Sequence, residues 1–161
     1  MFGFYKKVRV NEKAIDQFLE CIKSDSSGLQ SGPISKTSWN TGGIVRDELG
    51  VLFDQYLRKK IERKVGKVKV IDLWYQIYDA NSGSFHDWHI HPHSDYSITF
   101  YVQMKRDKNL FTQFRVKGKT KVVRASVGDC VIFNSSIVHK APSNLTDVDK
   151  IIVSANLVCD R

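Results

Sequence analysis

Three histidines carry the clearest chemical signal in this sequence. His89 and His91 are separated by one residue, and His139 follows much later in the chain. The first two directly precede a predicted strand over residues 97–104, so both imidazoles project from one side of an extended segment. Three neutral nitrogens or carboxylates on one face, with open positions opposite, is the arrangement by which non-haem Fe(II) holds oxygen and substrate together. We therefore expect a metal site at His89, His91 and His139.

The distribution of charge favours a cation near these histidines. The chain has 161 residues and a net charge of +8, from 25 Lys and Arg against 17 Asp and Glu. Residues 71–104 contain acidic residues but no Lys or Arg, and most of the histidines lie there. A segment without ammonium groups repels a metal cation less than the rest of this chain would.

Basic residues concentrate in two other runs, at residues 58–69 and 115–124. One interpretation is a surface that contacts the phosphates of nucleic acid. We favour solvated structural surfaces, a helix end and an edge hairpin, because neither run interleaves aromatic residues as a single-strand binder does. Nucleic acid is therefore a partner that the sequence allows but does not favour.

Composition and length predict a single domain over residues 1–161. Apolar residues make up 42% and charged residues 26% of the chain, which excludes a disordered tail or a membrane span. The first residues are too basic, and their apolar run too short, for a secretory signal. Cys21, Cys130 and Cys159 are widely spaced and odd in number, which indicates reduced thiols. We expect a cytoplasmic protein, in the host cytoplasm if the gene is carried by a phage, with no membrane partner.

Hydrophobic periodicity predicts two helices followed by strands. One helix follows Asn11 as its N-cap, and a second is expected over residues 46–64, ending at Gly66, with a Ser- and Gly-rich linker between them. The period then changes to two, and strands are expected around residues 67–78, 97–104, 111–116, 120–125, 130–134 and 150–158. This order predicts a mainly β fold, a sandwich or jelly roll braced by two helices, with residues 1–65 as helical support and 66–158 as the core.

Three segments resemble the Fe(II)/2-oxoglutarate-dependent oxygenases. Residues 87–102 are similar to the first iron-binding strand pair of that superfamily, and residues 128–142 to its distal-histidine strand. Residues 150–156 are similar to the closing strand, whose Arg or Lys binds the cosubstrate. The pattern is nearest to the small prolyl-hydroxylase-like members of bacteria and phages. The resemblance implies a double-stranded β-helix (jelly roll, cupin-like) and a dioxygenase that uses Fe(II) and 2-oxoglutarate. Such an oxidoreductase hydroxylates a substrate that the sequence does not identify, with a protein or peptide side chain as one candidate.

The chain departs from most of the superfamily at one ligand. Where the family pattern has His-x-Asp or His-x-Glu, this sequence has His89-x-His91. Either His91 takes the place of the carboxylate, or the true pair is His93 and Asp95, which have the same spacing but lie close to the next strand. We favour His91 and keep Asp95 as the rival ligand. An imidazole in place of a carboxylate leaves the site one unit more positive, which is expected to weaken Fe(II) retention.

The resemblance also assigns residues to the cosubstrate. It makes Lys150 the cation for the distal carboxylate of 2-oxoglutarate, as a point charge without the bidentate fork of arginine; the alternative is an ordinary edge-strand lysine. Tyr101 matches a position whose hydroxyl often hydrogen-bonds the same carboxylate, and Ser154 lies on the closing strand. Three residues that share one face of the strand before the ligands are weaker candidates for the substrate pocket: Trp74, Gln76 and Tyr78.

Two other functions remain open at the level of sequence. The histidines suit a cupin-like three-histidine metalloprotein that needs no 2-oxoglutarate. The basic runs suit a nucleic-acid-binding module on the same fold, with an affinity that falls steeply with salt. The first alternative predicts that 2-oxoglutarate does not perturb the bound metal. The second predicts that nucleic-acid affinity survives the loss of all three histidines.

Overall fold

The computed structural model describes residues 3–39, 41 and 44–161. The helices are α1 (Glu12–Ser24), α2 (Ile44–Tyr56), α3 (Arg58–Val65) and the short 3-10 helix η1 (Lys108–Leu110). One sheet contains β1 (Tyr5–Arg9), β2 (Leu29–Ser31), β3 (Ile34–Thr37), β4 (Val68–Tyr78), β6 (Tyr96–Gln103), β9 (Asp129–Asn134) and β11 (Lys150–Cys159). The other contains β5 (His86–His89), β7 (Gln113–Val116), β8 (Lys119–Val122) and β10 (His139–Ala141). No helix in the described part of the chain is long and apolar enough to cross a membrane.

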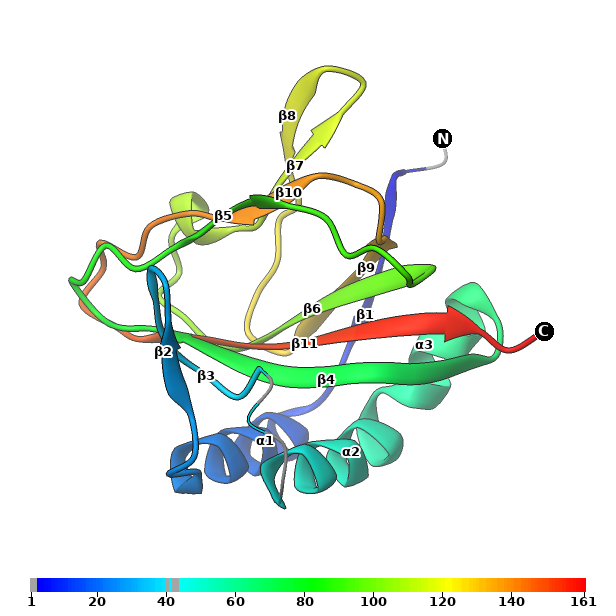
Figure 1. The fold of residues 1–161 in the computed structure, drawn as a ribbon, viewed down its shortest axis with the longest axis horizontal. Coiled ribbons are helices and arrows are strands. Elements are labelled where there is room, and N and C mark those ends of the chain that lie inside the picture. Colours follow the sequence, from blue (N-terminus) through cyan, green and yellow to red (C-terminus); the bar gives the residue numbers. More distant parts are fainter. Residues whose placement is uncertain (1–2, 40, 42–43) are drawn as a thin grey trace.

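The two sheets face each other, and α1 and α2 cover the outer side of the larger one (Figure 1). The larger sheet has the strand order β1-β9-β6-β11-β4-β3-β2, and the smaller one has β5-β10-β7-β8. Consecutive neighbours in both sheets pair antiparallel. The expected mainly β architecture with helices on one side is therefore present.

Helix α1 forms as its sequence predicts. The side chain of Asn11 accepts a hydrogen bond from the backbone N–H of Ala14 at 3.0 Å and so supplies the N-cap. Ala14, Phe18 and Ile22 are buried on one face of the helix, which packs on the larger sheet. There the ring of Phe18 lies edge-on to that of Phe100 on β6, with 4.9 Å between the ring centres.

The remainder of the N-terminal third is less helical than predicted. Strands β1, β2 and β3 all lie within it, and the β2–β3 hairpin occupies part of the segment that the composition assigns to a linker. These strands are short and have no clear alternation of apolar and polar residues. They are held by hydrogen bonding to neighbouring strands, as where Lys36 of β3 lies opposite Ile77 of β4. The second predicted helix is interrupted at Leu57, which leaves α2 and α3. Gly66, with a φ of +88°, ends α3 as expected.

Two hydrophobic clusters make up the core. The first joins the helices to the larger sheet, and the second lies between the two sheets. Phe114 and Phe133 of the second cluster contact each other edge-on, and Phe133 also packs edge-on against the ring of His139, with 4.7 Å between the ring centres. Apolar side chains of the second cluster thus pack directly against the ring of His139.

Candidate metal centre

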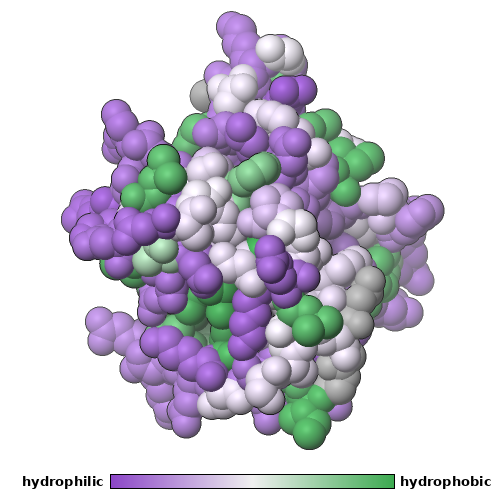
Figure 2. Space-filling model, turned by 60° about the vertical axis from the view of Figure 1, so that its left-hand side comes forward, coloured by the Kyte–Doolittle hydropathy of each residue, from purple (hydrophilic) through white to green (hydrophobic). Residues whose placement is uncertain are grey.

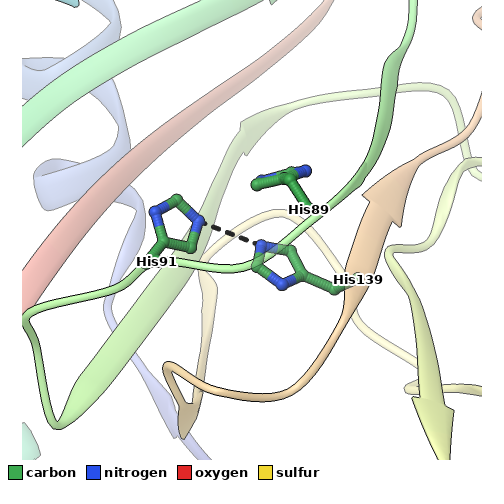
Figure 3. A group of neighbouring side chains, drawn as sticks. All are labelled: His89, His91 and His139. Carbon is green, nitrogen blue, oxygen red and sulfur yellow. Dashed lines mark hydrogen bonds between the residues drawn. The ribbon is translucent and has the colours of Figure 1, made fainter.

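The structure brings His89, His91 and His139 together on the inner side of the smaller sheet (Figure 3). His89 ends β5 and is paired with His139, which begins β10, while His91 lies in the loop before β6. One ring nitrogen from each residue lies within 4.8 Å of the others. The Nε2 atoms of His91 and His139 are 3.1 Å apart. Two ligands about 2.1 Å from a metal and at about a right angle are about 3.0 Å from each other, so this separation suits a first-row metal.

Backbone carbonyls orient two of the three rings. The Nδ1 atom of His139 lies 2.9 Å from the carbonyl oxygen of Ile137, and that of His89 lies 2.6 Å from the carbonyl oxygen of Asp87. Because a carbonyl oxygen only accepts, each Nδ1 carries the proton and donates it. Each Nε2 therefore keeps its lone pair, which is the arrangement that a metal-binding histidine needs.

Burial keeps the imidazoles neutral. Loss of solvation, reinforced by the neighbouring histidines, lowers the pKa of His139 to about 3 and that of His91 to about 4. The same loss of solvation lowers the pKa of His89. His86, whose ring stacks on His89 with 3.7 Å between ring centres, has its pKa lowered to about 4, mainly by burial. Neutral imidazole is the form that binds a metal, so the site is ready for one at neutral pH.

Buried hydroxyl groups hold the loop that carries His91. Its backbone N–H donates to the carbonyl oxygen of Ser135 at 3.0 Å, and its own carbonyl accepts from Ser94 Oγ at 3.2 Å. Ser94 Oγ also lies 2.7 Å from Ser135 Oγ, and Ser97 Oγ lies 2.9 Å from the same atom. Sequence reasoning missed Ser135, because a serine in a polar turn has no spacing that marks it as a support.

The rival ligand Asp95 lies outside the histidine group. Its Oδ2 atom accepts a hydrogen bond from the backbone N–H of Cys159 at 2.7 Å, and its Oδ1 atom is 3.8 Å from Arg161. This backbone hydrogen bond is the main cause of a lowered pKa of Asp95. The carboxylate therefore fastens the loop before β6 to the end of β11.

We expect Asp95→Asn to leave the affinity for Fe(II) or for a substitute such as Co(II) unchanged within about twofold, since the amide oxygen can still accept from the Cys159 backbone. The measurement is a competition titration of metal-free protein against a coloured chelator, under nitrogen. A loss of about tenfold or more would put Asp95 back among the ligands.

Lys150 is fully buried at the start of β11, which lies between β4 and β6, so it is not an edge-strand lysine. Its Nζ atom donates to the carbonyl oxygen of Leu110 at 2.6 Å and lies over the rings of Tyr78 and Tyr101, at 5.3 and 5.8 Å from their centres. No carboxylate of the described residues lies within 4.0 Å of it. Burial lowers the pKa of Lys150 to about 7. A buried ammonium without a counter-charge is costly to the folded protein and fits a site for an anionic ligand.

Tyr101 and Ser154, the other two cosubstrate candidates, lie in different settings. The Tyr101 hydroxyl accepts from the backbone N–H of Thr112 at 3.1 Å and lies 2.8 Å from Thr112 Oγ1. Ser154 lines the same cavity as Thr112 and the histidines. Thr112, in the loop between η1 and β7, was not singled out from the sequence, because only the fold places that loop against β6.

The cavity beside the histidines also contains all three weaker pocket candidates, Trp74, Gln76 and Tyr78. The Tyr78 hydroxyl donates to Gln76 Oε1 at 3.0 Å. The cavity has a volume of about 20 Å³, which is room for about one water molecule, so a larger ligand must displace some of the lining side chains.

A wider cleft of about 320 Å³, here called the outer cleft, is lined by His89 and His91 but not by His139. The β2–β3 hairpin and β5 contribute residues to its walls. Trp39 lines it and contacts Trp74 edge-on, with 4.5 Å between ring centres, and Trp74 lies 5.8 Å from His91. Trp39 falls in the segment that the composition assigns to a linker, so its sequence context did not mark it as part of a site.

Comparison with known proteins gives a match at the level of the fold. No family model and no curated protein matches the sequence. HygX from Streptomyces hygroscopicus, solved with nickel, 2-oxoglutarate and hygromycin B bound, aligns over 97% of this chain and 83% of its own, with a TM-score of 0.75 and 9% identity. A Pseudomonas putida prolyl-4-hydroxylase aligns over 98% and 94%, with a TM-score of 0.67 and 12% identity. The non-heme alpha ketoglutarate dependent epimerase SnoN from nogalamycin biosynthesis aligns over 97% and 76%, with a TM-score of 0.71 and 13% identity. These structures confirm the predicted double-stranded β-helix fold.

Proposed function

We propose that this chain is an Fe(II)- and 2-oxoglutarate-dependent dioxygenase that hydroxylates a C–H bond of a protein or peptide side chain. In this proposal His89, His91 and His139 hold the iron, and Lys150 binds the distal carboxylate of the cosubstrate. The observation that carries it is the combination, on this fold, of three neutral imidazoles on one face with a buried lysine that has no counter-charge among the described residues. When bound, Fe(II) and 2-oxoglutarate supply the oxidation of an unactivated C–H bond by dioxygen.

The protein's own groups position these partners. The carbonyl oxygens of Ile137 and Asp87 fix the rings of His139 and His89, so that both Nε2 atoms face the metal position. In its protonated form Lys150 supplies a positive charge in surroundings of low polarity, where its attraction for a carboxylate is strong. The aromatic rings around Lys150 and His139 exclude water from both positions.

The outer cleft supports a peptide as the substrate. It lies directly beside the histidines and carries Trp39, whose side chain is 40% exposed, next to the buried Trp74. An exposed aromatic beside an open cleft suits a segment of polymer better than an enclosed metabolite. A prolyl-4-hydroxylase is also among the proteins with a similar fold.

Two further expectations belong to this proposal. We propose that residues 1–161 act as one domain, since one hydrophobic cluster joins the helices of residues 1–65 to the sheet of the core. We also propose a cytoplasmic location, which the free thiols of Cys21, Cys130 and Cys159 support.

The main alternative is a three-histidine metalloprotein that works without 2-oxoglutarate. The absence of a carboxylate from the histidine group, among the residues described, favours it. It gives no role to the buried ammonium of Lys150, which would then destabilise the folded protein without serving a function. We therefore prefer the 2-oxoglutarate-dependent function.

An anaerobic titration separates the two. Fe(II) is added to metal-free protein, followed by 2-oxoglutarate, and the visible spectrum is recorded. We expect 2-oxoglutarate to produce a charge-transfer band that succinate does not produce, because only a 2-oxo acid can chelate the metal through its oxo group and adjacent carboxylate. Metal binding without such a band would support the alternative, and no metal binding would overturn both.

A further inference from the structure

The β7–β8 hairpin projects from the smaller sheet, at the top of Figure 1. Lys117 and Gly118 form its two-residue turn with φ values of +51° and +73°, which fits the turn type that two-residue hairpins prefer. All four residues of β8 are exposed. The top of the molecule in Figure 2, where this hairpin ends, is mostly hydrophilic.

The hairpin is basic along its whole length. Residues 115–124 contain no acidic residue and five basic ones, namely Arg115, Lys117, Lys119, Lys121 and Arg124. None of the ion pairs among the described residues includes any of these five. In the register of the hairpin, Lys119 and Lys121 lie opposite Val116 and Phe114 and share their face, whereas Arg115 lies opposite Thr120 on the other face, which is the one that Trp88 contacts. The hairpin therefore carries a concentrated positive charge that would attract a polyanion.

An aromatic side chain lies beside one of these basic residues, Arg115, although it comes from a different strand. The guanidinium carbon of Arg115 is 4.3 Å from the ring centre of Trp88 on β5, and Lys140 Nζ on β10 is 5.0 Å from it. Trp88 is partly exposed, and the adjacent Asp87 carboxylate accepts from its backbone N–H at 2.8 Å. This group, Trp88 with Arg115 and Lys140, could not be predicted from the sequence, because its three members come from three separate strands.

A basic cavity of about 370 Å³ lies where the hairpin chain returns to the body of the molecule. Its charged lining residues are Lys7, Arg106, Lys108, Arg124, Asp107 and Asp129. Asp129 is already paired, with Arg9 at 3.0 Å, and Asp107 Oδ1 accepts from a backbone N–H. The cavity therefore keeps an excess of positive charge next to Arg124.

We propose that the hairpin, the Trp88 group and this cavity together bind single-stranded nucleic acid. Basic side chains contact phosphates, and a partly exposed indole next to two cations offers a surface on which a nucleobase stacks. An acidic peptide would use the same charges but would not need the aromatic. Base stacking on Trp88 requires an unpaired base, so a single strand is favoured over a duplex.

This surface is separate from the histidine site. Trp88 and His89 are consecutive residues of β5, so their side chains lie on opposite faces of the smaller sheet. His89 faces His139 between the sheets, and Trp88 faces Arg115 outside. Binding at the outer face consequently depends on neither metal nor 2-oxoglutarate, and its failure would leave the proposed oxygenase activity untouched.

The test uses a fluorescent oligothymidylate of about 15 nucleotides, titrated with the full-length protein at several salt concentrations. We expect log K to fall with log salt with a slope of about −3, as for four to five phosphate contacts at about −0.7 each. Changing Lys117, Lys119 and Lys121 together to Gln should weaken binding about tenfold or more at low salt and reduce the slope by about 2. Trp88→Leu should weaken binding about fivefold and leave the slope unchanged.

The matched control changes an equal number of exposed lysines on α3, Lys59, Lys60 and Lys64, to Gln, with the same loss of net charge. This variant and His139→Ala should bind within about twofold of the parent protein. The proposal is overturned by absence of binding at low salt, by an equal loss in the control, by no effect of Trp88→Leu, or by tighter binding of a polyglutamate peptide than of the oligonucleotide. The substituted lysines are exposed, and an unchanged metal titration would verify that each lysine variant is folded.

Discussion

Lys150→Met is expected to stabilise the metal-free protein while removing most of its affinity for 2-oxoglutarate. The ammonium is fully buried, its hydrogen bond to Leu110 satisfies only one of three N–H groups, and burial lowers its pKa from 10.5 to about 7. That shift corresponds to a cost on the order of 4 kcal/mol at neutral pH, which an apolar side chain of similar length avoids. In the same change the cosubstrate loses the cation that is proposed to bind it, so its affinity should fall about a hundredfold or more.

The pH dependence of stability follows from the same group. Between pH 7 and 10.5 the unfolded chain holds a proton on this lysine that the folded chain has released. The free energy of unfolding therefore rises with pH through this window, and below pH 7 the penalty is constant. Lys150→Met should remove this rise. Because 2-oxoglutarate binds the protonated lysine, its affinity for the parent protein should fall about tenfold per pH unit above pH 7.

Urea unfolding at pH 7 and pH 9 measures the first effect, and the 2-oxoglutarate dependence of the charge-transfer band measures the second. Lys59→Met, at an exposed position on α3, is the control and should change neither. A Lys150→Met protein that is less stable than the parent and still binds 2-oxoglutarate normally would show that the lysine is structural.

His139→Ala is expected to weaken Fe(II) binding by about a hundredfold or more, and to abolish the 2-oxoglutarate band at metal concentrations that saturate the parent. His139 contributes the most buried of the three rings, and its Nε2 lies 3.1 Å from that of His91. With one of three neutral ligands gone, the remaining pair has no carboxylate to compensate. The measurement is the same anaerobic chelator competition that is used for Asp95→Asn.

His93→Asn is the matched control for this variant. His93 is exposed and has a φ of +72°, a conformation that asparagine tolerates well. We expect its metal affinity to equal that of the parent. Equal losses in the two variants would indicate general binding of metal to surface histidines, whereas retention of tight binding in His139→Ala would remove His139 from the ligand set.

The elements with a strong periodic pattern were predictable from the sequence. Asn11 marks the start of α1 through its side-chain cap, and Gly66 marks the end of α3 through its positive φ, since both are local effects. The break at Leu57 was not predictable, because the helical spacing of buried residues continues through it to Ile61. The strands β2 and β3 were missed because β3 is held by its pairing with β4 and β2 by its pairing with β3, and neither has a hydrophobic pattern of its own.

In the candidate site, the three histidines could be predicted from the sequence, because their residue type itself indicates metal binding. Histidine is a rare residue with few uses other than metal binding and proton transfer, so the spacing of these three along the chain was informative by itself. Thr112, Ser135 and Trp39 lie beside or support them, but their types are common and their distances along the chain carry no signal. Likewise Trp88 becomes part of a basic surface only when β5, β7 and β10 are side by side.

Strand β1 closes one side of the larger sheet by pairing with β9. Without β1, the backbone of β9 would be an open edge, and four of its consecutive residues, from Cys130 to Phe133, are apolar. Such an edge readily recruits a strand from another molecule. Lys6, Lys7 and Arg9 place charge along β1 itself, so the new outer edge repels a second copy. Strand β1 thus protects solubility during folding, and truncations or fusions that displace it risk aggregation even though no residue of the metal site is altered.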